Sequence, residues 1–158
     1  IENAVCTMSN LVVERQALLA IGGFDRTMRH VEDQDLLARL VGEGHLMRGI
    51  PETLVGYRMS ADGLSCDFSA MLDAWKDLAH RWSHRIDVKR GEALYCRYLA
   101  RRALRSGATT TLARDFVRRG LSSDTKAFLS GGPRGVATAG AALAAGALPA
   151  RARSAIFA

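Results

Sequence analysis

The sequence has few of the residues that build disulfide frameworks or metal sites. Its three cysteines are odd in number and far apart, and none forms a Cys-x-x-Cys pair. Reduced thiols, as in the cytosol, are the simplest account of Cys6, Cys66 and Cys96. Among the four histidines only His80 and His84 have helical spacing, and no third ligand follows them closely. This argues against a zinc site at that pair.

Long apolar runs are also missing. The most apolar segment, residues 136–148, is rich in alanine and glycine. It is shorter than the roughly 20 residues that a bilayer-spanning helix needs. Because Arg134, Arg151 and Arg153 flank it, two roles stay open: packing on neighbouring helices, or lying on an anionic membrane surface.

Acidic residues are scarce in the second half of the chain. Residues 68–158 hold sixteen lysines or arginines and six acids, a balance of +10, whereas residues 1–67 hold six arginines and ten acids, a balance of −4. The 158 residues have the length of one domain, and 48% are hydrophobic, enough for a core. The uneven charge nevertheless indicates two parts. The basic part is either a set of solvated helix faces or a surface for anionic lipid, an anionic substrate or nucleic acid.

Short β-rich runs alternate with helical patterns in the first part. The patterns predict a strand within residues 4–13 that ends near residue 10, a helix over 14–21, a loop over 25–31, a helix over 32–43, and strands over 45–50 and 53–59. Gly22 and Gly23 are predicted to end the first helix and Gly44 the second, because glycine adopts a left-handed cap at little cost.

From Phe68 onward the period becomes helical. Helices are predicted from 68 to about 86, over 92–105, over 111–119 with Gly120 as its end, from a cap at 122–124 to 129, and over 136–148. The glycines and proline at 131–133 are predicted to form a non-helical turn before the last helix. We therefore expect the second part to be almost wholly helical.

Two adjacent carboxylates, Glu32 and Asp33, open the second helical pattern. Acids in the first turn of a helix are stabilised by its free N–H groups and dipole, so a simple helix cap is one interpretation. The other is that one acid is a general base aimed at a substrate held by the preceding loop. Successive helical residues point about 100° apart, so only one of the two can face a given substrate.

An ordered set of short motifs carries a family resemblance. It comprises Gly-Gly-Phe-Asp at 22–25, Glu-Asp at 32–33, a leucine-rich helix with Arg39, Gly44, Pro-Glu at 51–52 and Tyr-Arg at 57–58. Together these motifs resemble the C-terminal half of the catalytic domain of family 2 glycosyltransferases, which have the GT-A fold. The resemblance covers about residues 6–65, less than half of the chain.

The resemblance implies an α/β fold in two parts. Residues 1–66 would be the acceptor-side, C-terminal half of a Rossmann-like nucleotide-diphospho-sugar transferase domain, and residues 67–158 a basic helical extension. It implies an inverting enzyme that moves a hexosyl or related group from a nucleotide-sugar to an acceptor hydroxyl, in cell-surface polysaccharide or glycoconjugate synthesis. Asp33 would be the catalytic base and Glu32 its support. The expected substrate-binding residues are Gly23, Phe24, Asp25, Arg26 and, for the diphosphate, Arg58.

The resemblance also implies Mg²⁺ or Mn²⁺ in a complete enzyme. The nucleotide-binding strand–helix repeats and their Asp-x-Asp motif are absent from the 158 residues, so we expect a segment of a longer protein, inactive alone and without a metal ligand of its own. Asp33-Gln34-Asp35 spells Asp-x-Asp, but within a helix, where we expect Asp35 to pair with Arg39 on an exposed face. Arg58 is followed by Met59 and Ser60 rather than by a histidine, and Ser60 cannot replace imidazole as a metal ligand.

The expected partners are a nucleotide-sugar donor and an acceptor glycan or lipid-linked acceptor. Peripheral membrane contact is a further candidate, and nucleic acid is not expected. The expected location is the cytoplasm. The inner face of the cytoplasmic membrane is a more specific candidate location. The alternative function is a non-catalytic basic helical module that binds a membrane surface or nucleic acid, because Leu99–Leu121 has an arginine-rich helix–turn–helix character.

Overall fold

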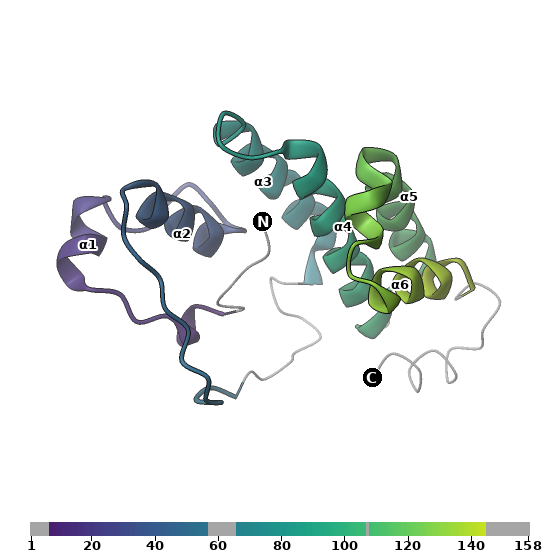
Figure 1. Ribbon diagram of the computed structural model, residues 1–158, viewed down its shortest axis with the longest axis horizontal. Helices are drawn as coiled ribbons and strands as arrows, with labels where there is room; N and C mark the ends of the chain where they lie inside the picture. The colour runs from purple at the N-terminus through teal and green to yellow at the C-terminus, as the bar shows by residue number, and fades with distance from the viewer. Residues whose placement is uncertain (1–6, 57–65, 107, 145–158) are drawn as a thin grey trace. The chain divides into compact units, whose positions relative to one another are not determined.

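A computed structural model describes residues 7–56, 66–106 and 108–144, which belong to two compact units (Figure 1). The first unit contains residues 7–56 and the second residues 66–144. The first includes the 3-10 helix η1 (Met8–Asn10) and the helices α1 (Arg15–Ala20) and α2 (Glu32–Gly42). The second includes α3 (Phe68–Arg81), α4 (Val88–Arg105), α5 (Thr110–Leu129) and α6 (Pro133–Ala144).

The α/β fold predicted for the first part is wrong, because no described residue lies in a strand. Residues 8–10 form η1 instead, and residues 45–56 follow an irregular, exposed path in which Leu46 is 89% and Leu54 68% exposed. A strand needs a neighbour that pairs with its N–H and C=O groups. These two segments have the composition of strands but no paired neighbour. Residues 4–6 and 57–59 of the predicted strands lie outside the described residues.

A small apolar core joins α1 and α2. It consists of Ala17, Leu36 and Leu40, with partly buried side chains around it: Met8, Leu11, Val13, Leu18 and Ile21. The predicted helices over 14–21 and 32–43 are confirmed to within a residue or two at each end.

Glycine ends both of these helices as the sequence predicts. Gly22 and Gly44 have φ of 78° and 87°, in the left-handed region. In each cap the next residue donates back to the last turn: the Gly23 N–H to the Leu18 carbonyl at 2.9 Å, and the His45 N–H to the Leu40 carbonyl at 3.1 Å. These are Schellman caps, which satisfy carbonyls that a helix end otherwise leaves without a partner.

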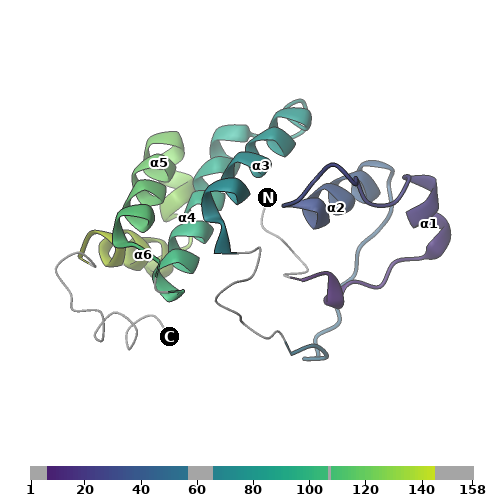
Figure 2. The same cartoon turned by 180° about the vertical axis from the view of Figure 1, so that it is seen from behind.

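The second unit is a helical bundle in which α4 contacts α3, α5 and α6. Figure 2 shows α4 between α3 and α5. Its most deeply buried side chains include Cys96 and Leu99 of α4 and Val117 and Phe128 of α5. Trp75 of α3 stacks on Tyr95 of α4, with 5.2 Å between ring centroids. The helical prediction for this part is thus confirmed for the residues that are described.

The boundaries of these helices differ from the predicted ones in four places. α3 ends at Arg81 rather than near 86, and α4 begins at Val88 rather than Glu92 because Asp87 caps it, accepting from the Arg90 N–H at 3.0 Å. α5 runs through Gly120, where a stop was predicted, and bends sharply at Asp124. The Asp124 carboxylate accepts from the Ala127 N–H at 2.8 Å. Asp124 therefore caps the helical segment that follows it, as predicted, although that segment is part of α5. α6 begins at Pro133, three residues before the predicted start.

Within the described ranges, no helix is both long enough and apolar enough to cross a membrane.

Candidate functional site

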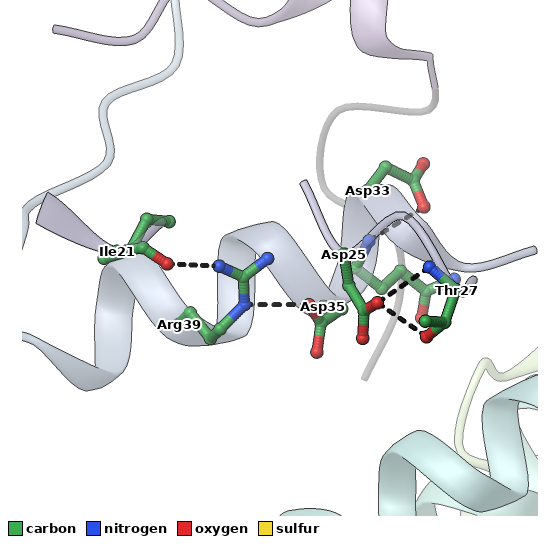
Figure 3. A network of polar contacts seen from close by, with 7 residues as sticks. Ile21, Asp25, Thr27, Asp33, Asp35 and Arg39 are labelled. Atoms are coloured by element: carbon green, nitrogen blue, oxygen red, sulfur yellow. Dashed lines mark hydrogen bonds and ion pairs between the residues drawn. The ribbon is translucent and has the colours of Figure 1, made fainter. Parts of the chain in front are cut away.

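The loop between α1 and α2 is ordered by its own side chains. One oxygen of Asp25, Oδ1, accepts from the Thr27 N–H at 2.9 Å and from the Thr27 hydroxyl at 2.6 Å (Figure 3). The Met28 N–H donates to the Asp25 carbonyl at 3.3 Å. Aspartate commonly closes a turn in this way. Asp25, expected to bind substrate, therefore also shapes the loop that would hold that substrate.

Val31 introduces α2 in an unusual backbone conformation. Its φ of 55° and ψ of 19° are left-handed, and its side chain is buried. A β-branched residue in this region is a rare outlier that costs on the order of 1–3 kcal/mol and persists only where the surroundings enforce it. The Val31 carbonyl accepts the first α2 hydrogen bond, from Asp35 N–H at 3.0 Å. The strained residue therefore fixes the point at which Glu32 and Asp33 enter the helix.

The third acid of this turn, Asp35, is committed to a structural ion pair. It is 2% exposed, and its Oδ2 lies 2.8 Å from Arg39 Nε. Arg39 Nη1 also donates to the carbonyl of Ile21 at 2.7 Å, which ties α2 to the end of α1 (Figure 3). The predicted pairing of Asp35 with Arg39 is confirmed. Its predicted exposure is wrong, because the side chain of Asp35 is 3% exposed and that of Arg39 25%.

Asp33 and Asp35 point in different directions. Residues two apart on a helix differ by about 200° around its axis, and Figure 3 shows Asp33 directed away from the Asp35–Arg39 pair. The two carboxylates therefore do not converge on one ion. Over the described ranges, no group of three or more histidine, cysteine or acidic side chains could hold a metal. The residues that the structure describes thus do not fit the Mg²⁺ or Mn²⁺ that the resemblance implies.

Glu32 and Asp33 remain as the partly exposed acids of this turn. Asp33 Oδ1 accepts from the Gln34 N–H at 2.8 Å, which fixes the rotation of that carboxylate. Of the loop residues expected to bind substrate, Arg26 is exposed, Phe24 is 44% exposed and Gly23 is half-buried. The loop and the helix start thus place most of the expected residues on one short segment. Arg58 lies outside the described residues.

The second unit contains a polar cluster that sequence reasoning missed. Glu92 of α4 accepts from Arg119 Nε at 2.6 Å and from the Ser123 hydroxyl at 2.5 Å, both on α5. Burial raises the pKa of the Glu92 carboxyl, but the hydrogen bonds from Ser123 and Arg119 and the charges of Arg119 and Lys76 lower that pKa by more. The net pKa lies below its usual value. These residues are too far apart in the chain for any local pattern to connect them.

Cys96, one turn along α4 from Glu92, is not a nucleophile. Burial, with a smaller contribution from the Glu92 charge, raises the pKa of its thiol to about 12. A thiol that stays protonated at neutral pH is a poor nucleophile and metal ligand. The Glu92 cluster and Cys96 therefore belong to the packing of α4 against α5, and the α1–α2 segment is the candidate site.

Comparisons with protein-family models, with curated proteins and with solved structures found no match to this chain.

Proposed function

We propose that residues 22–40 carry the acceptor-side base of an inverting glycosyltransferase. The enzyme would move a sugar from a nucleotide-sugar donor to an acceptor hydroxyl in the synthesis of cell-surface polysaccharide or glycoconjugate, on the cytoplasmic side of the membrane. One observation carries the proposal beyond the sequence resemblance: the three acids at the start of α2 are divided between two roles. Asp35 is buried against Arg39, whereas Asp33 and Glu32 stay accessible at the end of an ordered loop.

The proposed chemistry needs one positioned carboxylate. The acceptor oxygen attacks the anomeric carbon, the bond from that carbon to the diphosphate breaks, and the hydroxyl proton passes to the carboxylate. The Gln34 N–H donates to Asp33 Oδ1 at 2.8 Å and holds the carboxylate in a fixed orientation. This preorganisation supports Asp33 as the base, because a base must lie within hydrogen-bond reach of the proton that it removes.

The neighbouring residues have supporting roles in this proposal. Glu32, about 100° away on the helix, would hold a second acceptor hydroxyl rather than the reacting one. The exposed ring of Phe24 offers an apolar face to a sugar ring, and Arg26 offers hydrogen-bond donors. The Asp25–Thr27 turn would keep this loop in one conformation.

The proposal is tested by Asp33→Asn in the native protein that contains this sequence. The substitution keeps the shape of the side chain and an oxygen for the Gln34 N–H but removes its basicity. We expect kcat at saturating donor to fall by about 10²–10⁴-fold, the usual contribution of a positioned base, while the donor Kd measured by calorimetry stays within twofold.

Glu32→Gln is the matched control, and it should reduce kcat less. Near-normal turnover in Asp33→Asn together with loss of turnover in Glu32→Gln would move the base to Glu32. Normal turnover in both variants would show that the acidic pair only caps the helix, and it would contradict the enzymatic proposal.

A further inference from the structure

One side of α4 carries a stripe of basic residues. Six of its eighteen residues are lysine or arginine, and its single acid is Glu92. At about 100° per residue, the positions of Arg90, Leu94, Arg97, Arg101 and Arg105 fall within an arc of about 80°. Glu92 lies on the other side of the helix, where Arg119 neutralises it. The stripe is exposed at Arg90 and Arg105 and partly exposed between them, where Arg97 Nη1 donates to the Phe128 carbonyl at 3.0 Å. We call these five residues the basic stripe.

Aromatic and cationic groups continue the basic stripe along its edge. Tyr98 is exposed, and its hydroxyl accepts from Arg102 Nη1 at 2.9 Å. The guanidinium of Arg102 also lies over the rings of Tyr98 and Phe68, 5.7 and 5.9 Å from their centroids. A tyrosine with its polar end held beside arginines suits a boundary between water and an apolar medium.

α6, which begins near this stripe, has an uncharged outer side. No residue from 135 to 144 is charged. Val136 and Leu143 are 60% and 57% exposed, with exposed Gly140 between them at helical spacing. α6 contacts α4 and α5. A methyl group added at Gly131, in the turn before α6, would lie 2.8 Å from Arg97 Nη1, so α6 begins beside the basic stripe.

The end of α6 is held on the bundle by α5. Arg114 Nε and Nη2 donate to the carbonyls of Ala142 and Leu143, both at 3.2 Å. These two bonds hold the last described turn of α6, in which Ala142 is buried and Leu143 is exposed. The outer side of α6 therefore remains apolar in water without a partner from the rest of the described bundle.

We propose that the unit of residues 66–144 docks on an anionic phospholipid bilayer through the basic stripe of α4 and the outer side of α6. Arginines complement the phosphates of the headgroups, and Val136 and Leu143 enter the boundary between headgroups and acyl chains. A nucleic acid would match the charge of the stripe but would leave the apolar side of α6 in water. The docking is independent of the glycosyltransferase proposal, and it would bring a lipid-linked acceptor to the enzyme if both hold.

Flotation of the whole 158-residue chain with vesicles tests this docking. We expect recovery with mixed phosphatidylglycerol–phosphatidylcholine vesicles at low salt, a marked loss at 0.5 M salt, and little recovery with phosphatidylcholine alone. Arg90→Gln combined with Arg105→Gln should weaken binding about 25-fold, since each basic residue near the surface contributes about fivefold. Leu143→Gln should also weaken it, because it removes an inserted side chain. Helical circular dichroism confirms that each variant is folded.

Arg118→Gln is the control for each single arginine substitution, because Arg118 is exposed on α5, outside the basic stripe, and its Nη1 lies 4.0 Å from Asp115 Oδ1. It should change vesicle affinity less than twofold. Equal flotation with neutral vesicles, or an equal loss of affinity in Arg118→Gln, would overturn the proposal. So would tighter binding to a 20-base-pair DNA duplex than to the anionic vesicles, at the same salt and with the same dependence on Arg90 and Arg105.

Discussion

Arg39 links the two helices that carry the candidate site. Its guanidinium bonds to Asp35 on its own helix and to the carbonyl of Ile21, immediately before the glycine cap of α1. The loop between Ile21 and Glu32 is consequently held at both ends. Sequence spacing was sufficient to find the Asp35–Arg39 pair, but the bond to Ile21 depends on how the chain folds back.

Asp35→Asn should destabilise the first unit. The change removes the charge from a buried hydrogen-bonded pair, so we expect a loss of about 1.5–3 kcal/mol, the usual range for a hydrogen bond to a charged group. Hydrogen exchange of the amides in α1 and α2 is the measurement, because it reports on this unit separately. Asp33→Asn, in the same helical turn but partly exposed, should leave exchange nearly unchanged. Equal effects of the two substitutions would contradict a special structural role for Asp35.

Glu92 should make the second unit sensitive to acid. Because its native pKa is lowered, the group adds stability above the unfolded value of about 4.3. That stability is lost as the pH falls through the lowered native pKa. Urea unfolding at pH 7 and at successive steps toward pH 2 should show the loss in the native chain, and Glu92→Gln should reduce it. The same pH dependence in both proteins would show that other carboxylates cause it.

At the scale of elements, Gly120 allows α5 to approach α4. A methyl group there would lie 2.5 Å from Cδ2 of Phe128 and 2.9 Å from Cβ of Cys96. Gly120→Ala should therefore destabilise the second unit by about 1–3 kcal/mol, the usual cost of overpacking, although alanine favours helix. Gly140→Ala is the matched control, because nothing lies within 4 Å of the added group. It should stabilise α6 by about 0.5–1 kcal/mol. The melting temperatures of both variants test this prediction. A higher melting temperature in Gly120→Ala would contradict the close packing.

Gly120 also shows where sequence reasoning about the helices failed. A glycine at this position predicts a helix end, but in the structure Gly120 permits close packing, which depends on Phe128 and Cys96 from elsewhere in the fold. The ends predicted at Gly22 and Gly44 are confirmed, because a Schellman cap is a local arrangement. The helices themselves were predictable because amphipathic spacing and caps such as Asp87 are properties of neighbouring residues.

At the scale of the whole molecule, the predicted strands failed for a related reason. Residues 45–56 have the composition of strands, but pairing requires a partner segment, and none of the described residues provides one. The acidic turn of the candidate site, by contrast, was predictable to the residue, since it depends on a helix start that local sequence specifies. The left-handed backbone of Val31 was not, because nothing in its residue type favours it.

The unpaired segment should make the chain self-associate. Leu46, Ile50 and Leu54 are 65–89% exposed within twelve residues, and such patches favour association. Sedimentation velocity at rising concentration should show oligomers, and Leu46→Lys combined with Ile50→Lys should reduce them. Thr53→Lys, which adds charge in the same segment without removing an apolar side chain, should reduce them less. A monodisperse monomer at all concentrations would contradict the prediction.

The bend at Asp124 has a consequence for how the protein is made. It turns the last part of α5 back so that Phe128, fully buried, reaches Gly120 and Cys96. On the ribosome, α4 and the first part of α5 are synthesised before this ring, and translation at about 5–20 residues per second takes about 0.4–1.6 s to pass from Gly120 to Phe128. During that interval the contact face of α4 and α5 lacks its central aromatic side chain. The packing of α4 against α5 therefore closes only after the ring arrives, and Ala142 of α6 completes the buried core later still.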